Sequence, residues 1–175
     1  LQLDKITEYV FEVLQNSNFN QEVHEAFMDL AVGTGCMLVE EGDAINPVKF
    51  TAVPLPKVCL LNGPDGKIDT VYRTRKVKPE HIRVLYPKAV MPENFDLLQQ
   101  KKELTIVEAV YKIYKENEEK YKYCVVLDNP KAVIFEEEYS GEGSNPYLVF
   151  RWNKASGEVY GRGPIFNAMG AIKTC

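Results

Sequence analysis

The stretch GEVYGRGPIFNAMGAIKTC, residues 157–175, constrains the fold of this chain most, because two glycines, an arginine and a proline stand directly before an apolar segment. Pro164 suits the first position of a helix, where its missing N–H group is not needed and its fixed φ angle is already helical. Apolar residues then recur at helical spacing, namely Ile165, Ala168, Met169 and Ile172. The stretch therefore predicts that Gly161 and Gly163 bend the chain into a helix that begins at Pro164.

The composition is that of a soluble globular protein, with room for one domain of ordinary size or two small lobes. Of the 175 residues, 45% are hydrophobic and 26% are charged, and the net charge is −4. No apolar run reaches the roughly 18–20 residues of a membrane-spanning helix. The first residues, LQLDKITEYV, carry neither an initiating Met nor a signal-peptide pattern. We therefore expect a piece of a longer protein, open at both ends, with no membrane partner and with 161–175 as the start of a truncated helix.

The cysteines and histidines form no metal-binding motif. Cys36, Cys59, Cys124 and Cys175 lie far apart, with no CxxC pair among them. The first three lie in β-like apolar runs, where a free cysteine usually serves as a small hydrophobe. This favours reduced core thiols, which are typical of a cytoplasmic protein, over disulfides. Two histidines without paired cysteines argue against a zinc site, and we expect no cofactor.

The N-terminal third predicts two amphipathic helices. The first spans 3–16 and the second starts after Asn18, which with Gln21 resembles a capping box. Gly33-Thr34-Gly35 then ends the second helix, since glycine is the usual left-handed cap. The apolar stripes consist of Leu3, Ile6, Val10, Val13 and Leu14 in the first helix, and of Phe19, Val23, Ala26, Phe27 and Leu30 in the second.

Two β-rich blocks follow, separated by short helices. The first block, with runs at 36–40, 49–53, 57–61 and 68–77, predicts an antiparallel meander. Helical candidates occupy 79–86 and 92–102, each with a proline near its start. The second block has runs at 105–115, 121–128, 131–139 and 147–152, of which the first two suggest a hairpin across the charged loop 116–120. Residues 106–114 also fit a helical period, but their Val, Ile and Tyr content favours a strand.

The predicted fold class is therefore α+β. In chain order we expect N-terminal helices, an antiparallel β meander, short helices, a second β-rich lobe and the start of a long helix.

No catalytic motif is found in the sequence. The glycines of GRGP, residues 161–164, suggest a phosphate loop, but the GxxxxGK[ST] frame and its lysine are missing. The alternative is a backbone role, in which the glycines bend the chain at the entry to the helix. Arg162 would then be available to a carboxylate or to a neighbouring subunit.

A basic cluster is the most prominent charged feature. It consists of Arg73, Arg75, Lys76, Lys78, Arg83 and Lys88. Because phosphate affinity rises with each charge that is neutralised, the cluster suggests contact with nucleic acid. The whole chain is acidic, however, and its aromatic residues are not interleaved with the cluster as stacking platforms would be. An ion-pair surface between subunits is the alternative that we favour.

Three stretches together resemble a known family. They are SNF with the following helix and the Gly-Thr-Gly step into a strand (17–40), FTAVPL through a turn to DGKIDTVYR (50–73), and YLVFRWNKASGEVYGRGP with its helix and IKT (147–174). In this order they resemble the head-to-tail connector, or portal, protein of short-tailed double-stranded-DNA bacteriophages. GEVYGRGP is the most specific part, and Gly170 departs from the residues that the family usually has there.

The resemblance implies a non-enzymatic structural subunit of the virion. It implies a ring of about twelve copies at one capsid vertex, assembled in the host bacterial cytoplasm, around a channel for DNA packaging and ejection. The partners would be the packaging terminase ATPase, capsid, scaffold and tail proteins, and the double-stranded DNA in the channel. By resemblance, 1–78 would belong to the wing, 79–102 to a stem-like segment and 103–160 to a clip-like β lobe, with 161–175 starting a second stem helix. A nucleic-acid-binding module that uses the basic residues of 73–88 is the alternative function.

Overall fold

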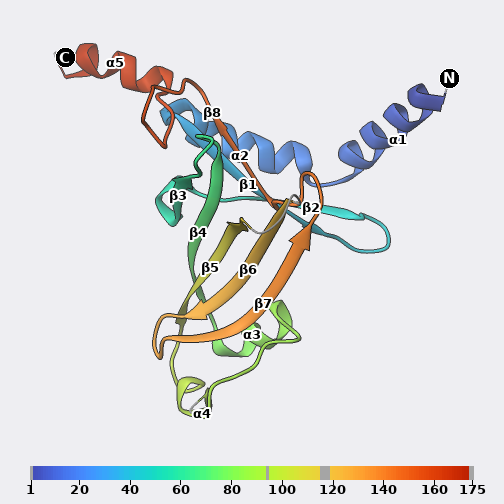
Figure 1. Cartoon of the computed structure of the whole chain (residues 1–175), viewed down its shortest axis with the longest axis vertical. Coiled ribbons are helices and arrows are strands. Elements are labelled where there is room, and N and C mark those ends of the chain that lie inside the picture. Colours follow the sequence, from blue (N-terminus) through green and yellow to red (C-terminus); the bar gives the residue numbers. More distant parts are fainter. Residues whose placement is uncertain (1, 94, 115–118, 174–175) are drawn as a thin grey trace. The chain divides into compact units, whose positions relative to one another are not determined.

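The computed structural model describes residues 2–93, 95–114 and 119–173 (Figure 1). The chain forms two compact units, one of residues 1–56 with 146–175 and one of residues 57–145. We call them unit 1 and unit 2. Helices accompany two antiparallel sheets, so the predicted α+β class is confirmed. The assignment of 1–78, 79–102, 103–160 and 161–175 to wing, stem and clip parts stays a prediction.

Unit 1 is built on a three-stranded sheet of order β2-β1-β8, formed by β1 (Thr34–Glu41), β2 (Val48–Ala52) and β8 (Tyr147–Arg151). Its helices are α1 (Gln2–Asn16), α2 (Phe19–Val32) and α5 (Pro164–Ile172), as predicted, and a short 3-10 turn, η1, covers Leu55–Lys57. Ala26 of α2 packs with Met37 and Phe50 of the sheet to form the core of this unit.

The N-terminal cap of α2 differs from the predicted capping box. Asn18 makes no side-chain cap hydrogen bond. Its Nδ2 donates instead to the carbonyl oxygen of Phe50 at 2.7 Å, and its Oδ1 accepts from the Phe50 N–H at 3.0 Å. Glu22 likewise accepts from the Ala52 N–H at 2.6 Å. The physical reason is that β2 is an edge strand, whose outward N–H and C=O groups need partners, and the start of α2 provides them.

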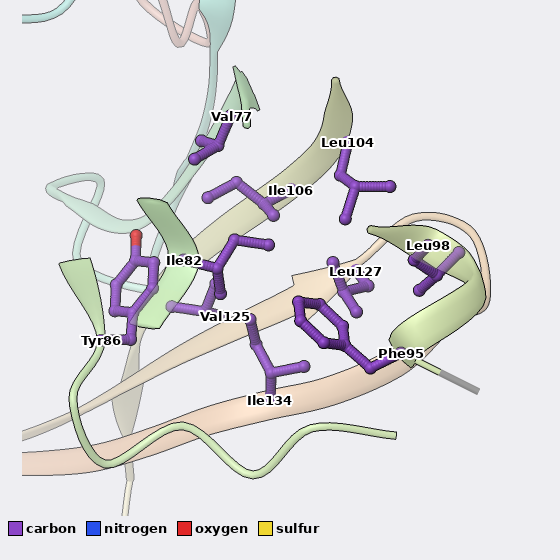
Figure 2. Close-up of a cluster of buried hydrophobic side chains, with 10 residues drawn as sticks. All are labelled: Val77, Ile82, Tyr86, Phe95, Leu98, Leu104, Ile106, Val125, Leu127 and Ile134. Carbon is purple, nitrogen blue, oxygen red and sulfur yellow. The ribbon is translucent and has the colours of Figure 1, made fainter. Parts of the chain in front are cut away.

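Unit 2 is built on a five-stranded sheet of order β3-β4-β5-β6-β7. The strands are β3 (Val58–Asn62), β4 (Ile68–Val77), β5 (Leu104–Ile113), β6 (Lys120–Leu127) and β7 (Ala132–Ser140). Two short helices, α3 (Pro79–Leu85) and α4 (Phe95–Leu98), lie between β4 and β5 in the chain. Figure 2 shows Ile82 and Phe95 from these helices among the sheet residues Ile106, Val125 and Ile134 in a common core. The helix expected at 92–102 is thus shorter than predicted.

The strands are grouped differently from the two blocks of the sequence. The meander expected over 36–77 is wrong as a single sheet, since β1 and β2 lie in one sheet and β3 and β4 in the other. The reason is the VPLP stretch after β2, because the prolines at 54 and 56 supply no N–H group for a hairpin ladder. The strand expected at 147–152 exists, but it pairs with β1 rather than with β7.

The cysteine prediction is confirmed in part. Cys36, Cys59 and Cys124 are free thiols. Cys36 is buried and Cys124 half-buried, whereas the prediction that Cys59 lies in the core is wrong. The reason is the alternation of β3, which buries Val58 and Leu60 and turns the residue between them to solvent. Cys175 and most of the charged loop 116–120 lie outside the described residues.

Candidate functional site: a glycine junction and a buried carboxylate

In unit 1, the backbone of GRGP, residues 161–164, lies very close to the turn between α2 and β1. Gly33 ends α2 with a φ of +155°, and its N–H donates to the carbonyl oxygen of Asp29 at 3.1 Å. A Cβ atom on Gly33 would lie 2.0 Å from the carbonyl oxygen of Gly161, and one on Gly161 would lie 2.2 Å from that of Gly33. A Cβ on Gly163 would meet the carbonyl oxygen of Ala31 at 2.2 Å. Only glycines allow the two backbone segments to approach this closely.

The close approach of residues 161–163 to residues 31–34, which we call the glycine junction, is held by hydrogen bonds. The N–H of Gly161 donates to Oγ1 of the buried Thr34 at 2.8 Å, and the N–H of Gly163 donates to the carbonyl oxygen of Val32 at 2.9 Å. The N–H of Arg162 donates to the carbonyl oxygen of Asn153 at 2.8 Å. A phosphate loop needs several such N–H groups directed at its ligand. All three are used within unit 1, so the geometry favours the backbone role of these glycines over the phosphate loop.

Pro164 begins α5, as predicted, with Gly163 at the N-cap position in an extended conformation. The side chain of Arg162 lies on the surface beside this helix start. Its Nε donates to Glu158 at 2.9 Å, Nη2 makes a second bond to the same carboxylate, and the guanidinium lies 5.1 Å from the ring centre of Phe166. The hydrogen bond from Arg162 holds the pKa of Glu158 below its ordinary value, and the same bond raises the pKa of Arg162.

In unit 2, the predicted basic cluster does not form one surface. Arg73 and Arg75 lie on the face of β4 that also carries the buried Val71 and Val77, whereas Lys76, the residue after Arg75, is exposed. Both arginines bind the carboxylate of Glu108, with Nη1 of Arg73 at 3.4 Å and Nη1 of Arg75 at 3.0 Å. The other members, Lys76, Lys78, Arg83 and Lys88, are exposed. The cluster therefore divides into two internally paired arginines and four solvated residues.

Glu108 lies on β5 opposite Arg73 and is only 1% exposed. The hydroxyl of Tyr86 also donates to this carboxylate, and the hydroxyl of Tyr123 donates to Tyr86 at 3.4 Å. Burial raises the pKa of Tyr86 most, and the negative charge of Glu108 raises it further. Burial alone would lower the pKa of Arg75, but the charge and hydrogen bond of Glu108 raise it overall. This side-chain set, which we call the Glu108 cluster, is a compensated charge network.

The sequence contained a signal for Glu108 that our prediction did not use. In TIVEAVY, residues 105–111, one carboxylate shares a strand face with Ile106 and Val110. A charged residue on an apolar strand face requires a partner of opposite charge, and Arg73 and Arg75 of β4 have the matching alternation. The Glu108 carboxylate is bound inside unit 2 by Arg73, Arg75 and Tyr86, which fits a structural role.

Residues 2–93, 95–114 and 119–173 also bear on metal binding and on membrane insertion. In that part of the chain, no group of three or more His, Cys, Asp or Glu residues is arranged to hold a metal ion. Among the helices described, none is long and apolar enough to cross a membrane.

Comparison with known proteins identifies the family. The search of curated proteins found no match. Residues 2–175, by contrast, match the family described as bacteriophage head to tail connecting protein. The match includes both units, the glycine junction and the Glu108 cluster, and it agrees with the resemblance that rests on 17–40, 50–73 and 147–174. The chain therefore belongs to the family of bacteriophage head to tail connecting proteins.

Proposed function

We propose that this connector chain is a structural subunit of a portal ring that surrounds a channel for DNA packaging and ejection. The single observation that carries the proposal is the family match over residues 2–175. In the proposal, about twelve copies form the ring at one capsid vertex. The packaging terminase ATPase, scaffold and tail proteins dock on it during assembly in the host bacterial cytoplasm.

Exposed apolar side chains support a role in assembly. In unit 1, Leu3 is 78% exposed, Met28 is 68% exposed and Phe166 is 47% exposed. Clusters of exposed apolar side chains on a folded protein mark surfaces that other molecules cover. A subunit that makes contacts with several neighbours needs such surfaces on more than one element.

A catalytic role has no comparable support. In the residues described, the polar clusters consist of hydrogen bonds and ion pairs that hold strands and turns, as at Glu108 and Thr34. We therefore propose that the chain does no chemistry and that the packaging ATPase is a separate partner. The wing, stem and clip assignments of 1–78, 79–102 and 103–160 are proposals as well.

The net charge of −4 suits a channel part through which DNA slides, because like charges disfavour persistent contact. A map of the assembled ring in which the acidic residues face away from the ring axis would contradict this part of the proposal. For the alternative, a nucleic-acid-binding module, the exposed basic residues are Lys76, Lys78, Arg83 and Lys88. Such a module would bind DNA with an affinity that falls steeply as salt rises.

The oligomeric mass of the full-length protein tests the proposal. Native mass spectrometry and electron microscopy are expected to show a large closed ring. A stable monomer under conditions in which the protein is folded would contradict the ring. Tight, salt-sensitive binding of that monomer to DNA would favour the alternative.

A further inference from the structure

Within the described part of unit 1, helix α5 is held mainly at its base. Residues 164–171 are all exposed, and the exposed fractions of Ile165, Phe166 and Met169 are 46%, 47% and 40%. Gly163, directly before the helix, is buried. Because the side chains of α5 bury little surface, the direction of the helix depends on how its base is attached.

The base is tied to three different elements of unit 1 by the N–H groups of three consecutive residues. Gly161 donates to Oγ1 of Thr34 at the start of β1 at 2.8 Å, Arg162 to the carbonyl oxygen of Asn153 after β8 at 2.8 Å, and Gly163 to that of Val32 at the end of α2 at 2.9 Å. Attachment at three separate points fixes both the position and the direction of a rigid body, whereas attachment at a single point leaves it free to turn.

The glycines of this base serve contact and not flexibility. Glycines often mark hinges, because their φ and ψ angles are the least restricted. Gly163, however, has a φ of −87° and a ψ of 175°, an extended conformation that any residue adopts. What excludes a side chain there is the backbone of α2, since a Cβ atom would lie 2.2 Å from the carbonyl oxygen of Ala31. Backbones packed this closely leave no space into which the base could move.

The first turn of α5 continues rigidly from the base. The ring of Pro164 fixes the φ angle at the first helical position. The N–H of Phe166 donates to the carbonyl oxygen of Gly163 at 3.1 Å, and the guanidinium of Arg162 lies 5.1 Å from the centre of the Phe166 ring. The base and the start of the helix therefore form one body.

We propose that the glycine junction is a fixed joint that sets the direction of α5 relative to α2 and to the β2-β1-β8 sheet. The use of such a joint rests on the proposed ring, because identical copies around one axis have to present the same helix in the same direction. The joint itself is a property of unit 1 and can be measured whether or not a ring forms.

Distances between two spin labels in the full-length protein test the joint. Glu25 on α2 and Asn167 on α5, both exposed, are each replaced by a ketone-bearing amino acid that takes a spin label. Labelled chains are diluted with an excess of unlabelled chains, so that only pairs within one chain are measured by pulsed electron resonance. A reference pair at Glu25 and the exposed Glu40 reports on α2 and β1, which share the core of unit 1. We expect the two distance distributions to be equally narrow.

Variants of the junction show whether it is the cause. Gly163→Ala forces the base away from Ala31 and is expected to broaden the Glu25–Asn167 distribution about twofold, while the reference pair stays unchanged. Thr34→Val keeps the shape of the side chain, removes only the acceptor of the Gly161 N–H and should broaden it less. The matched control is Gly170→Ala, which meets nothing within 4 Å and should change neither distribution.

Each outcome has a distinct meaning. A Glu25–Asn167 distribution that is broader than the reference in the unchanged protein would show a hinge and overturn the proposal. Unchanged distributions in both Gly163→Ala and Thr34→Val would show that other contacts direct α5, and would overturn it as well. If Gly163→Ala does not fold, Thr34→Val decides. A narrow distribution that the variants broaden, in a protein that forms no ring, would support the joint and contradict the proposed function, whereas a ring with a broad distribution would contradict the joint alone.

Discussion

Replacement of Glu108 by glutamine removes one negative charge from the interior of unit 2 while the shape of the side chain is kept. Glu108 is 1% exposed and is held by Arg73, Arg75 and the hydroxyl of Tyr86. In the Glu108→Gln variant, an amide oxygen can still accept from Tyr86 and Arg75. The amide NH₂ group then faces Arg73, so two donors meet where an ion pair stood.

The loss of stability expected for Glu108→Gln depends on how exposed Arg73 and Arg75 are. Loss of one partner from a buried ion pair typically costs about 3–5 kcal/mol, because the remaining charge is left uncompensated. Arg73 is 12% exposed and retains this penalty, whereas Arg75 is 33% exposed and can turn toward water. Since the glutamine also keeps part of the hydrogen bonding, we expect the free energy of unfolding to fall by about 2–3 kcal/mol.

Urea unfolding followed by circular dichroism measures this change. With a slope of about 2 kcal/mol per molar urea, the midpoint should fall by roughly 1 M or more. Hydrogen–deuterium exchange should localise the effect to the strands of residues 57–145. The matched control is Glu136→Gln on β7, where the carboxylate is 51% exposed and pairs with Lys122 at 3.1 Å. Because exposed pairs contribute about 0–1 kcal/mol, its midpoint should barely move.

Equal midpoints for the two variants would refute the reasoning, since they would mean that the buried carboxylate is no more important than a surface one. A further variant separates charge compensation from simple loss of packing. Replacement of Glu108, Arg73 and Arg75 together by apolar residues of similar size should recover much of the stability that Glu108→Gln loses, because no buried charge is left without a partner.

Three other expectations are tested by similar means. Gly161→Ala places a Cβ 2.2 Å from a facing carbonyl oxygen, and we expect a loss of about 1–3 kcal/mol in urea unfolding. Gly170→Ala in α5 meets nothing within 4 Å and should stabilise by about 0.5–1 kcal/mol, so equal effects of the two would contradict the tight junction. Arg162 lowers the pKa of Glu158 from the ordinary 4.5; the stabilisation is therefore present above pH 4.5 and lost as pH falls through the lower folded value. Carboxyl NMR titration should show the Glu158 midpoint return to its ordinary value in Arg162→Gln, and an unchanged midpoint would argue against the pair.

The local elements of this fold could be predicted from the sequence, because each depends on signals within a few residues. The helix at Pro164 has its proline at the first position, and the end of α2 has Gly33. The strands of 104–113 and 120–127 are rich in Val, Ile and Tyr and pair as a hairpin. Periodicity and turn residues, together with the Val, Ile and Tyr content of 106–114, were sufficient for these elements.

The grouping of strands could not be predicted, because it depends on pairs that are far apart in the chain. β8 pairs with β1 in the register Cys36↔Val149, more than a hundred residues away in the sequence. Nothing in the sequence YLVFR, residues 147–151, indicates which sheet edge this strand joins. The same limit applies to the glycine junction. GRGP signals a bend, but the need for Gly161 arises from Gly33, a residue of another element.

The glycine junction and the Glu108 cluster stabilise the two units from within, so contacts with other molecules are expected at the surface. At the junction, the N–H groups of Gly161 and Gly163 are used inside unit 1, and in unit 2 the buried Glu108 is bound by two arginines. Helices α1 and α5 expose apolar side chains, and exposed apolar patches on a folded protein mark surfaces that other molecules cover. In the proposed ring, the two units stay folded through these internal bonds while the exposed apolar helices contact neighbouring copies.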